Sequence, residues 1–406
     1  MVATLFGLTT NPKLGLERMG HLLSLINSKH PPRGIVQVVG TNGKGSTVAL
    51  VESMLRAANI GVGLFTSPHL CTVRERIRIN GQTISEDELV ASACYVLDRA
   101  HTMQDQPSFF ECMLAMALKL FSEHKVEVAI LEAGLGGRLD ATTAANASVL
   151  GVTMIDFDHQ NILGATIEEI AKEKMGAARK GQTVVTVSQA PKVRAIIHAH
   201  QRAIGFDLLD APLCHRPLAL FGDHQKANAG LAIELVHSIG IKLDSAQCDQ
   251  GLREVNWPGR FEIVPGEEAV VLDGAHNPSG ISCLIESLRF HPMFIKRPLV
   301  VVYGSLKSEH AYDKVRLLAN SGLNIARIYV HQSDNERALT VDDLRNLFGR
   351  AGVPGELVGG FYDWSSVLAV AKQLSAAVVI CGSLYTVGAL RSAILGIPMD
   401  KKVPNF

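Results

Sequence analysis

The chain has 406 residues, enough for two or three ordinary domains, each with a hydrophobic core of its own. Basic and acidic side chains both total 39, so no net field favours nucleic acid or a membrane surface, and an anionic ligand must be held by local groups. The seven cysteines include no CxxC pair and the first residues do not resemble a signal peptide, which predicts a cytoplasmic protein with reduced, buried thiols.

From residue 35 onward, short apolar runs alternate with longer amphipathic ones, which predicts parallel strands joined by right-handed helical crossovers. The predicted strands of a first series are IVQVV, VGLF, VEVAIL and SVLGVTMI, and those of a second series are AVVLD, PLVVVYG, IARIYV and AAVVICG. Glycine or charge breaks every long apolar stretch, which favours buried strands over membrane spans. Between the two series, Pro258-Gly259 interrupts helix and strand alike, so we predict two α/β domains at residues 1–255 and 256–406.

A glycine-rich loop, GTNGKGST at residues 40–47, follows the first predicted strand and opens a helix. Ligands of open parallel sheets bind beyond the carboxyl ends of the strands, and helix amide groups attract phosphate. The spacing differs from the usual phosphate loop, because Gly45 stands between Lys44 and Ser46. Lys44 is expected to reach the terminal phosphates and Ser46 a metal ion, whereas the plainer alternative is a tight turn without a ligand.

Three further strand ends carry oxygen or imidazole groups. Ser67 follows the second strand, Glu132 the third, and Asp158-His159 the fourth. Mg²⁺ prefers oxygen ligands and tolerates imidazole, which suits Ser67, Glu132 and His159. Taken singly, each residue has a plainer explanation as a turn, solvated or structural residue, but their shared position at neighbouring strand ends favours a site. Glu111 in SFFE has capping-box spacing and is predicted to cap a helix first.

Lys174 lies in a predicted helix on the same stripe as three apolar residues, Ile167, Ile170 and Ala171. An ammonium group that faces the interior costs free energy unless it is paired or chemically altered. The alternative is a side chain that carries its charge to solvent along an apolar stem.

The motifs GTNGKGS, TSPHL, EAGLGGRLDAT, DHQNILG and IAKEK occur in this order, with KLGLERM before them and HQKANA, WPGRFE, DGAHNP and GSLYTVG after them. Over nearly the whole chain they resemble the folylpolyglutamate synthase/dihydrofolate synthase family of the Mur ligase superfamily. The resemblance implies a P-loop-type parallel-sheet ATPase domain and a Rossmann-like glutamate-ligase domain. It also implies an ATP-dependent amide ligase, in which a substrate carboxylate takes the γ-phosphate and the acyl phosphate is attacked by L-glutamate. The RLDAT sequence resembles bifunctional members, which accept dihydropteroate as well as folates.

The resemblance also implies roles for individual residues. The catalytic groups are Lys44, His159, Lys174 and His276, and Lys174 is expected to be carbamylated. ATP contacts are implied for Gly40, Thr41, Asn42, Gly43, Lys44, Gly45, Ser46, Thr47, Asn228, Arg260 and Asp273. The implied Mg²⁺ ligands are Ser67, Glu132 and His159, with K⁺ as an optional second ion, the implied folate contacts are Asp140 and Ala141, and the implied glutamate contacts are His276 and Ser383. The plainer alternatives are a loop residue for Asp140, a turn for DGAHNP and a helix entry for Ser383.

Two departures from the family pattern stand out. The segment from Phe206 to Phe221 is short, and SLKSEH replaces an Asp-Lys-Asp run, although Lys307 remains. Three alternatives stay open: a monofunctional folylpolyglutamate synthase, a Mur-type ligase of peptidoglycan precursors, and a nucleotide-gated binding module without ligase chemistry. The loop of the Mur-type ligases usually has the sequence GTxGKT, whereas this chain has GTNGKGS, which favours a folate ligase. The expected partners are small-molecule substrates only, with no nucleic acid or membrane, and the chain is expected to be a monomer.

Overall fold

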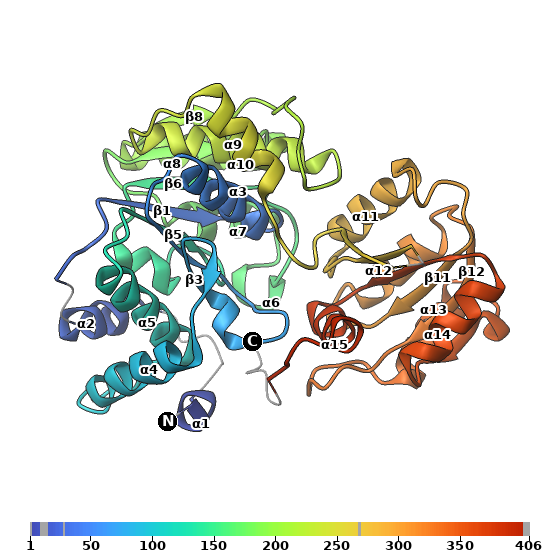
Figure 1. Cartoon of the computed structure of the whole chain (residues 1–406). Helices are drawn as coiled ribbons and strands as arrows, with labels where there is room; N and C mark the ends of the chain where they lie inside the picture. The colour runs from blue at the N-terminus through green and yellow to red at the C-terminus, as the bar shows by residue number, and fades with distance from the viewer. Residues whose placement is uncertain (1, 9–14, 27–28, 267–268, 401–406) are drawn as a thin grey trace.

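Two sheets, each covered by helices, lie side by side in the protein (Figure 1). The computed structural model describes residues 2–8, 15–26, 29–266 and 269–400. Lys13 and Leu14 of the KLGLERM motif lie outside these described residues. The predicted α/β fold with two mainly parallel sheets is confirmed.

The first sheet has the strand order β4-β3-β2-β5-β1-β6-β7-β8. Its strands are β1 (Gly34–Val39), β2 (Val62–Phe65), β3 (Ile77–Ile79), β4 (Gln82–Thr83), β5 (Val128–Glu132), β6 (Val149–Val152), β7 (Thr183–Thr186) and β8 (Asp207–Asp210). From β2 to β8 in that order the strands are parallel, while β3 and β4 are antiparallel. Strand β1 lies between β5 and β6 and is covered on both faces, which explains its nearly continuous apolar sequence.

Helices cover both faces of this first sheet. They are α1 (Val2–Phe6), α2 (Glu17–Leu25), α3 (Lys44–Ala57), α4 (Glu86–Ala100), α5 (Phe109–Glu123), α6 (Gln160–Leu163), α7 (Ile167–Met175), α8 (Pro191–Ile204), α9 (His224–Ser238) and α10 (Ser245–Glu254), with 3₁₀ turns η1 (Val73–Arg76) and η2 (Ala141–Ala145). Helices α3, α9 and α10 bury Val36 and Val38 on one face. On the other face α4 and α5 cover Phe65, and α7 and α8 cover Leu150 and Val152.

The second sheet has the order β13-β12-β11-β14-β10-β9, and only β9 is antiparallel among its described strands. Its strands are β9 (Glu262–Val264), β10 (Val270–Leu272), β11 (Leu299–Tyr303), β12 (Ile325–Val330), β13 (Val358–Gly360) and β14 (Ala377–Cys381). Its helices are α11 (Pro278–Phe290), α12 (Ala311–Ala319), α13 (Val341–Arg350), α14 (Trp364–Gln373) and α15 (Leu384–Leu395), with η3 (Gly355–Leu357). The first three helices pack on one face and the last two on the other.

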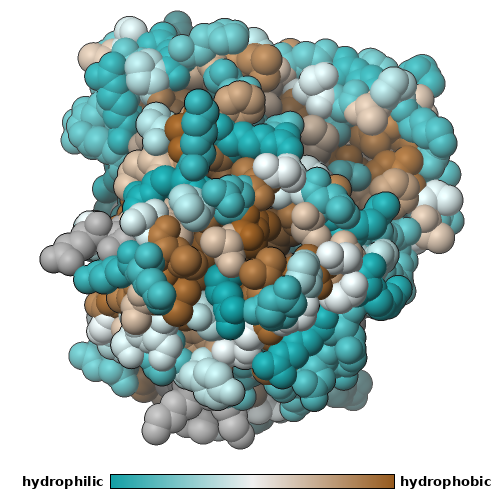
Figure 2. Space-filling view, turned by 90° about the vertical axis from the view of Figure 1, so that its right-hand side faces the viewer, coloured by the Kyte–Doolittle hydropathy of each residue, from teal (hydrophilic) through white to brown (hydrophobic). Residues whose placement is uncertain are grey.

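The chain passes between the two units from Glu254, where α10 ends, to Glu262, where β9 begins. After α15 it returns to the first unit, where Asp400 Oδ2 accepts a hydrogen bond from the Val73 amide (2.6 Å) and the Asp400 amide donates to the Cys71 carbonyl (3.0 Å). The surface turned towards the viewer in Figure 2 carries apolar side chains in several areas among hydrophilic ones. Within the part of the chain that the structure describes, no helix is long and apolar enough to cross a membrane.

Two details differ from the sequence prediction. The antiparallel edge strands β3, β4 and β9 were not predicted, because each has only two or three residues and no apolar run. The fourth predicted strand, SVLGVTMI, ends at Val152 rather than at Ile155. Its last residues turn towards the glycine loop, where the Met154 carbonyl accepts a hydrogen bond from the Thr41 amide (2.8 Å).

Candidate active site

The glycine loop between β1 and α3 owes its unusual spacing to three close neighbours. Gly40 and Gly43 have positive φ angles of 144° and 94°. A Cβ atom at Gly40 would lie 1.9 Å from Thr153 Oγ1, and one at Gly43 would lie 2.4 Å from Asn228 Oδ1. At Gly45 a Cβ atom would lie 2.9 Å from the Trp257 indole nitrogen.

Each glycine therefore admits a neighbour that a side chain would exclude. The glycine between Lys44 and Ser46 is required because the tryptophan of the WPGRFE motif packs directly on the loop. The loop is closed at its other end by Thr41, whose hydroxyl donates to the Asp156 carbonyl (2.9 Å).

Lys44, the first residue of α3, folds back over the loop, and its Nζ donates to the carbonyls of Gly40 (3.1 Å) and Thr41 (3.0 Å). Burial lowers the pKa of Lys44, while the charges of Glu132 and Asp158 oppose this shift. Two hydroxyl groups lie in the first turn of the helix. Ser46 Oγ accepts from Gln225 Nε2 (3.4 Å), and Thr47 Oγ1 is buried without a hydrogen-bond partner within the described residues. An ammonium group, helix amides and an unsatisfied hydroxyl fit a phosphate group.

Ser67 and Glu132 meet at the ends of β2 and β5. The Ser67 amide donates to Glu132 Oε2 (3.1 Å), and the Ser67 hydroxyl accepts from the guanidinium of Arg76 (3.2 Å). Burial raises the pKa of Glu132, and the charges of Lys44 and Arg260 oppose the rise. These two residues supply oxygen donors of the kind that Mg²⁺ prefers, and phosphate oxygens and water commonly complete its octahedral shell.

His159 lies apart from this pair. It precedes α6 with a left-handed backbone (φ 50°), and its side chain is 46% exposed, with Nε2 3.9 Å from Asp158 Oδ1. Burial and nearby lysines lower the pKa of His159, so its imidazole is neutral at pH 7 and able to act as a ligand. No cluster of three His, Cys, Asp or Glu side chains able to hold a metal occurs within residues 2–400 as far as they are described. The structure thus brings together two of the three predicted metal ligands.

Lys174 points inward, as its position on the apolar stripe predicts. It is 4% exposed, and its Nζ donates to the Gly40 carbonyl (2.8 Å), the same oxygen that Lys44 contacts. Burial and the charge of Lys44 lower the pKa of Lys174 to about 7. The alternative of a side chain that reaches solvent is therefore wrong. The lysine lies within the described structure without a carboxylate partner.

The segment that contains Asp140 and Ala141 packs beside Lys174, because a Cβ atom on Gly137 would lie 2.4 Å from the Lys174 carbonyl oxygen. Both carboxylate oxygens of Asp140 are engaged within this segment: Oδ1 accepts from the Thr142 amide (3.0 Å) and Oδ2 from the Leu135 amide (2.9 Å). Asp140 thereby caps η2, which Ala141 begins. The structural alternative for Asp140 is confirmed, and its contact with a pterin stays a prediction.

At the second sheet, the DGAHNP turn follows β10. Asp273 accepts hydrogen bonds from the amides of Phe261 (2.9 Å) and Ala275 (2.8 Å), so its carboxylate braces the turn. The Nδ1–H of His276 donates to the Gly274 carbonyl (2.8 Å), because a carbonyl oxygen can only accept. The opposite nitrogen, Nε2, therefore carries a lone pair and lies 3.8 Å from Asp158 Oδ2.

The His276 side chain is 41% exposed. Burial of the ring lowers its pKa to about 4, so it is neutral at pH 7. Arg260 packs against this turn, because a Cβ atom on Gly274 would lie 2.4 Å from its guanidinium. Its charge acts on Lys44 and Glu132 of the first unit and on Asp273 of the second.

Sequence reasoning missed the contacts that join the two units at this point. Asn277 Nδ2 donates to Asn42 Oδ1 (2.9 Å) and to Asp158 Oδ2 (3.1 Å), and Asn42 Nδ2 donates back to Asn277 Oδ1 (3.2 Å). His310 and Gln160 form a second link, with Nε2 and Oε1 2.6 Å apart. The motifs GTNGKGS, DHQNILG and DGAHNP contain all of these residues except His310, but the sequence gives no sign that they pair.

The last two predicted residues are buried and hydrogen-bonded. Asn228 Nδ2 donates to Gln225 Oε1 (2.9 Å) beneath the glycine loop. Ser383 Oγ accepts from the Tyr385 amide (3.2 Å) at the start of α15, so the predicted alternative of a helix entry is confirmed.

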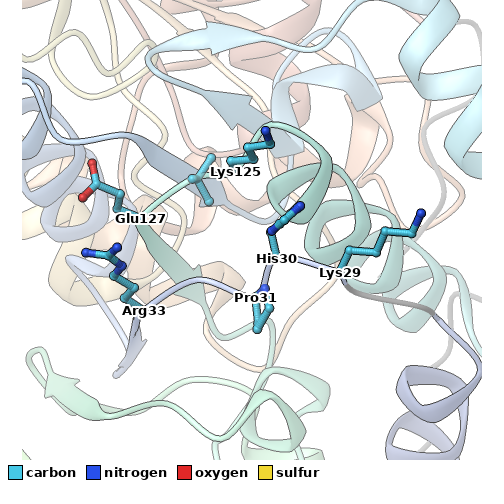
Figure 3. A pocket seen from close by; sticks show the side chains of 7 residues that line it. Lys29, His30, Pro31, Arg33, Lys125 and Glu127 are labelled. Atoms are coloured by element: carbon cyan, nitrogen blue, oxygen red, sulfur yellow. The ribbon is translucent and has the colours of Figure 1, made fainter.

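Figure 3 shows the side chains that line a separate hollow of about 390 Å³. It is lined by Lys29, His30, Pro31, Arg33, Lys125, Val126 and Glu127. These residues precede β1 and β5, at the edge of the sheet opposite the glycine loop. The hollow therefore takes no part in the site described above.

Comparisons with known proteins agree with this geometry. A sequence profile described as the Mur ligase glutamate ligase domain matches residues 259–384. A Bacillus subtilis protein named dihydrofolate synthase/folylpolyglutamate synthase is 36% identical over 75% of this chain and 79% of its own length. The chain belongs to the dihydrofolate synthase/folylpolyglutamate synthase family.

Two further members of this family extend the comparison. A Haloferax volcanii protein named "Probable bifunctional folylpolyglutamate synthase/dihydropteroate synthase" is 33% identical over 94% of this chain, but the chain spans only 48% of that relative. Among solved structures, "E.coli FolC in complex with DHPP and ADP" superimposes with a TM-score of 0.86 at 27% identity and covers 97% of both chains. The two-sheet architecture is therefore the fold of this dihydrofolate synthase/folylpolyglutamate synthase family.

Proposed function

We propose that this chain is an ATP-dependent ligase that joins L-glutamate to dihydropteroate and to the γ-carboxylates of folates through an acyl phosphate. The observation that carries the proposal is the junction of two sheet edges. A glycine loop that the ammonium groups of Lys44 and Lys174 contact is hydrogen-bonded through Asn42 and Asn277 to the turn that presents His276. The complex of E. coli FolC with DHPP and ADP supports the choice of substrates.

Both chemical steps bring anions together, and the loop offsets their repulsion. Lys44 and the amide groups that open α3 would hold the terminal phosphates of ATP. Glu132 and Ser67 would hold Mg²⁺, with His159 as a third ligand, and the ion would neutralise charge on the phosphate oxygens. Arg260, whose charge acts on groups of both units, would contribute a further positive charge.

At the second unit, His276 Nε2 would accept a hydrogen bond from the ammonium group of the incoming L-glutamate. Its fixed tautomer keeps this nitrogen unprotonated, because Nδ1 already donates to a carbonyl. Asn42, Asn277 and Asp158 would hold this turn against the glycine loop and exclude water from the acyl phosphate.

Lys174 is proposed to carry a carbamate, formed when its neutral amine adds CO₂ and releases a proton. Free lysine is almost fully protonated at pH 7, whereas a pKa of about 7 leaves roughly half of the Lys174 side chains neutral. The carbamate would replace a buried cation beside Lys44 with an anion, which favours retention of the modification.

We expect Lys174→Ala to lower ligation severely, and short carboxylates such as acetate to restore part of it by replacing the carbamate. Steady-state turnover with and without added acetate measures the effect. Wild-type protein stripped of CO₂ should regain activity with bicarbonate faster above pH 7 than below it, because the neutral amine predominates there. If the Lys174→Ala variant turned over at the same rate as the wild-type protein, the carbamate would be excluded.

The same pKa shift predicts how stability changes with pH. The folded-state pKa of about 7 lies below the ordinary 10.5, so between these values the unfolded chain binds more protons and stability rises with pH. Lys174→Met should therefore raise the melting temperature relative to wild type most at or below pH 7, and least near pH 10. Because a carbamate on Lys174 would reduce this difference in melting temperature, both proteins are measured in CO₂-free buffer.

The decisive experiment compares dihydropteroate and tetrahydrofolate side by side, each with ATP and L-glutamate. Turnover of both supports the bifunctional enzyme, and turnover of tetrahydrofolate alone indicates a monofunctional folylpolyglutamate synthase. A UDP-muramoyl precursor as the sole substrate would refute the assignment. The absence of glutamate-dependent ADP release with any acceptor would indicate a nucleotide-gated binding module.

The boundary between an ATP-binding domain (residues 1–255) and a glutamate-ligase domain (residues 256–406) stays a prediction, as does the binding of K⁺. So do the monomeric state and the cytoplasmic location.

A further inference from the structure

One buried cation of the second unit lacks an anionic partner among the described residues. Lys314 on α12 is 2% exposed, and its Nζ donates to Ser305 Oγ (2.7 Å). This hydroxyl is the single hydrogen-bond partner of the ammonium group among the described residues, and no described carboxylate forms an ion pair with it. An ammonium group has three donors, and burying it without a counter-charge costs free energy. The group is therefore suited to an anion that the folded chain does not itself provide.

The carboxylate whose charge acts on Lys314 is Asp158 of the first unit, and it is engaged with other groups. Its Oδ2 accepts from Asn277 Nδ2 (3.1 Å) and lies 3.8 Å from His276 Nε2. Burial lowers the pKa of Lys314 to about 8, so the side chain is still mainly charged at pH 7. The charge of Asp158 thus opposes the lowering of the Lys314 pKa without an ion-pair contact.

Lys314 lies at the edge of the second sheet where ligands of such sheets bind. Ser305 follows β11, and β11 neighbours β14, which neighbours β10. The residues after these three strand ends include Ser305, Ser383 and the turn with His276. The charge of Lys314 also lowers the pKa of His276. In open parallel sheets this edge is the usual ligand position.

We propose that Lys314 binds a carboxylate of the amino-acid substrate and so helps to position it for attack on the acyl phosphate. The inference rests on the proposed function, under which this substrate is L-glutamate. A buried ammonium with two unused donors forms strong, charge-assisted hydrogen bonds to a carboxylate. The neighbouring His276 would then meet the amine at the other end of the same molecule.

The test is Lys314→Met, which keeps the length of the side chain and removes its charge. The KM for L-glutamate should rise about tenfold to a hundredfold, while the KM values for ATP and the folate substrate stay unchanged. Arg316→Met is the matched control, because it removes a cation from the same helix where the side chain is 57% exposed. It should leave all three KM values unchanged.

A second variant guards against misfolding. Ser305→Ala removes the hydroxyl that holds Nζ and should raise the KM for L-glutamate by a smaller factor. Two glutamate analogues, in which either the γ-carboxylate or the α-carboxylate is replaced by an amide, identify the carboxylate that Lys314 binds. Wild-type protein should have a higher KM for the analogue that lacks this carboxylate, and in Lys314→Met this difference from L-glutamate should disappear.

An unchanged KM for L-glutamate in both variants, together with a higher melting temperature of Lys314→Met, would overturn the inference and identify an unpaired structural charge. A rise confined to the KM for ATP or folate would overturn it as well. Failure of the proposed function would be recognised separately, since wild-type protein would then show no glutamate-dependent turnover.

Discussion

The carboxyl edges of the two sheets achieve rigidity in different ways. At the first edge, missing side chains shape the loop: Gly40, Gly43 and Gly45 admit neighbours at distances that no Cβ atom tolerates. At the second edge, polar side chains hold the turns, because Asp273 and Ser383 are hydrogen-bonded to backbone amides. The first edge therefore leaves the Thr47 hydroxyl and the remaining donors of its two ammonium groups for a ligand, whereas the second uses most of its polar atoms internally and leaves His276 and Lys314. The polar groups that a local structure leaves without internal hydrogen bonds indicate its chemistry better than those that hold the loop or turn in shape.

The largest effect is expected from Lys44→Ala, which removes a cation from the first edge. By analogy with the loss of one group that stabilises transition-state charge, kcat should fall about 10²–10³-fold. Its Nζ contacts only carbonyls of its own loop within the described structure, so the melting temperature should change little. Lys192→Ala, at a 74% exposed side chain of the same unit, is the control for charge loss. Near-normal turnover by Lys44→Ala would contradict the assignment of the loop.

An intermediate effect is expected from Gly43→Ala, which tests whether missing side chains shape the first edge. The positive φ of 94° and the approach of Asn228 Oδ1 to 2.4 Å from the new Cβ should cost about 1–3 kcal/mol and weaken ATP binding accordingly. Gly349→Ala in α13 is the matched control, since a Cβ atom there meets nothing within 4 Å. Calorimetric titration with ATP measures the affinity of both variants. Equal affinities would mean that the loop accommodates a side chain at residue 43 without loss of ATP binding.

The smallest effect concerns the bond between the two edges. Single substitutions Asn42→Ala and Asn277→Ala each break the reciprocal amide pair, so the double variant should lose less than the sum of the single losses. A coupling of about 0.5–3 kcal/mol in kcat/KM is expected for residues in direct contact. Strict additivity in this double-mutant cycle would show that the pair does not contribute to the reaction.

Local patterns in the sequence predicted the sheets and most strand ends, but not the contacts between distant segments. Strand β1 and helix α3 are recognisable because an apolar run and a glycine loop are adjacent in the chain. Asn42 and Asn277 are 235 residues apart, and no periodicity links them. The engagement of both Asp140 oxygens was likewise invisible, since it depends on the path of its own loop.

The burial of Lys314 is also indicated by the spacing of apolar residues around it. Ala311, Lys314, Val315 and Leu318 have the same i, i+3, i+4, i+7 spacing that marked Lys174 as inward-facing. Both lysines are buried in the structure, and in both cases burial lowers the pKa. A lysine on an apolar helical stripe therefore indicated a buried amine twice in this chain.

The return of the chain after α15 restricts how substrates enter and products leave. Apart from the side-chain contacts of Asn277 and His310 with the first unit, the two units are joined covalently through residues 255–261 and by hydrogen bonds from Asp400 to the backbone of Cys71 and Val73. A single joint permits rotation in every direction, whereas two separated joints permit it only about the line that connects them. Wider separation of the two halves requires Asp400 to detach, so truncation before this residue should loosen the protein and speed product departure.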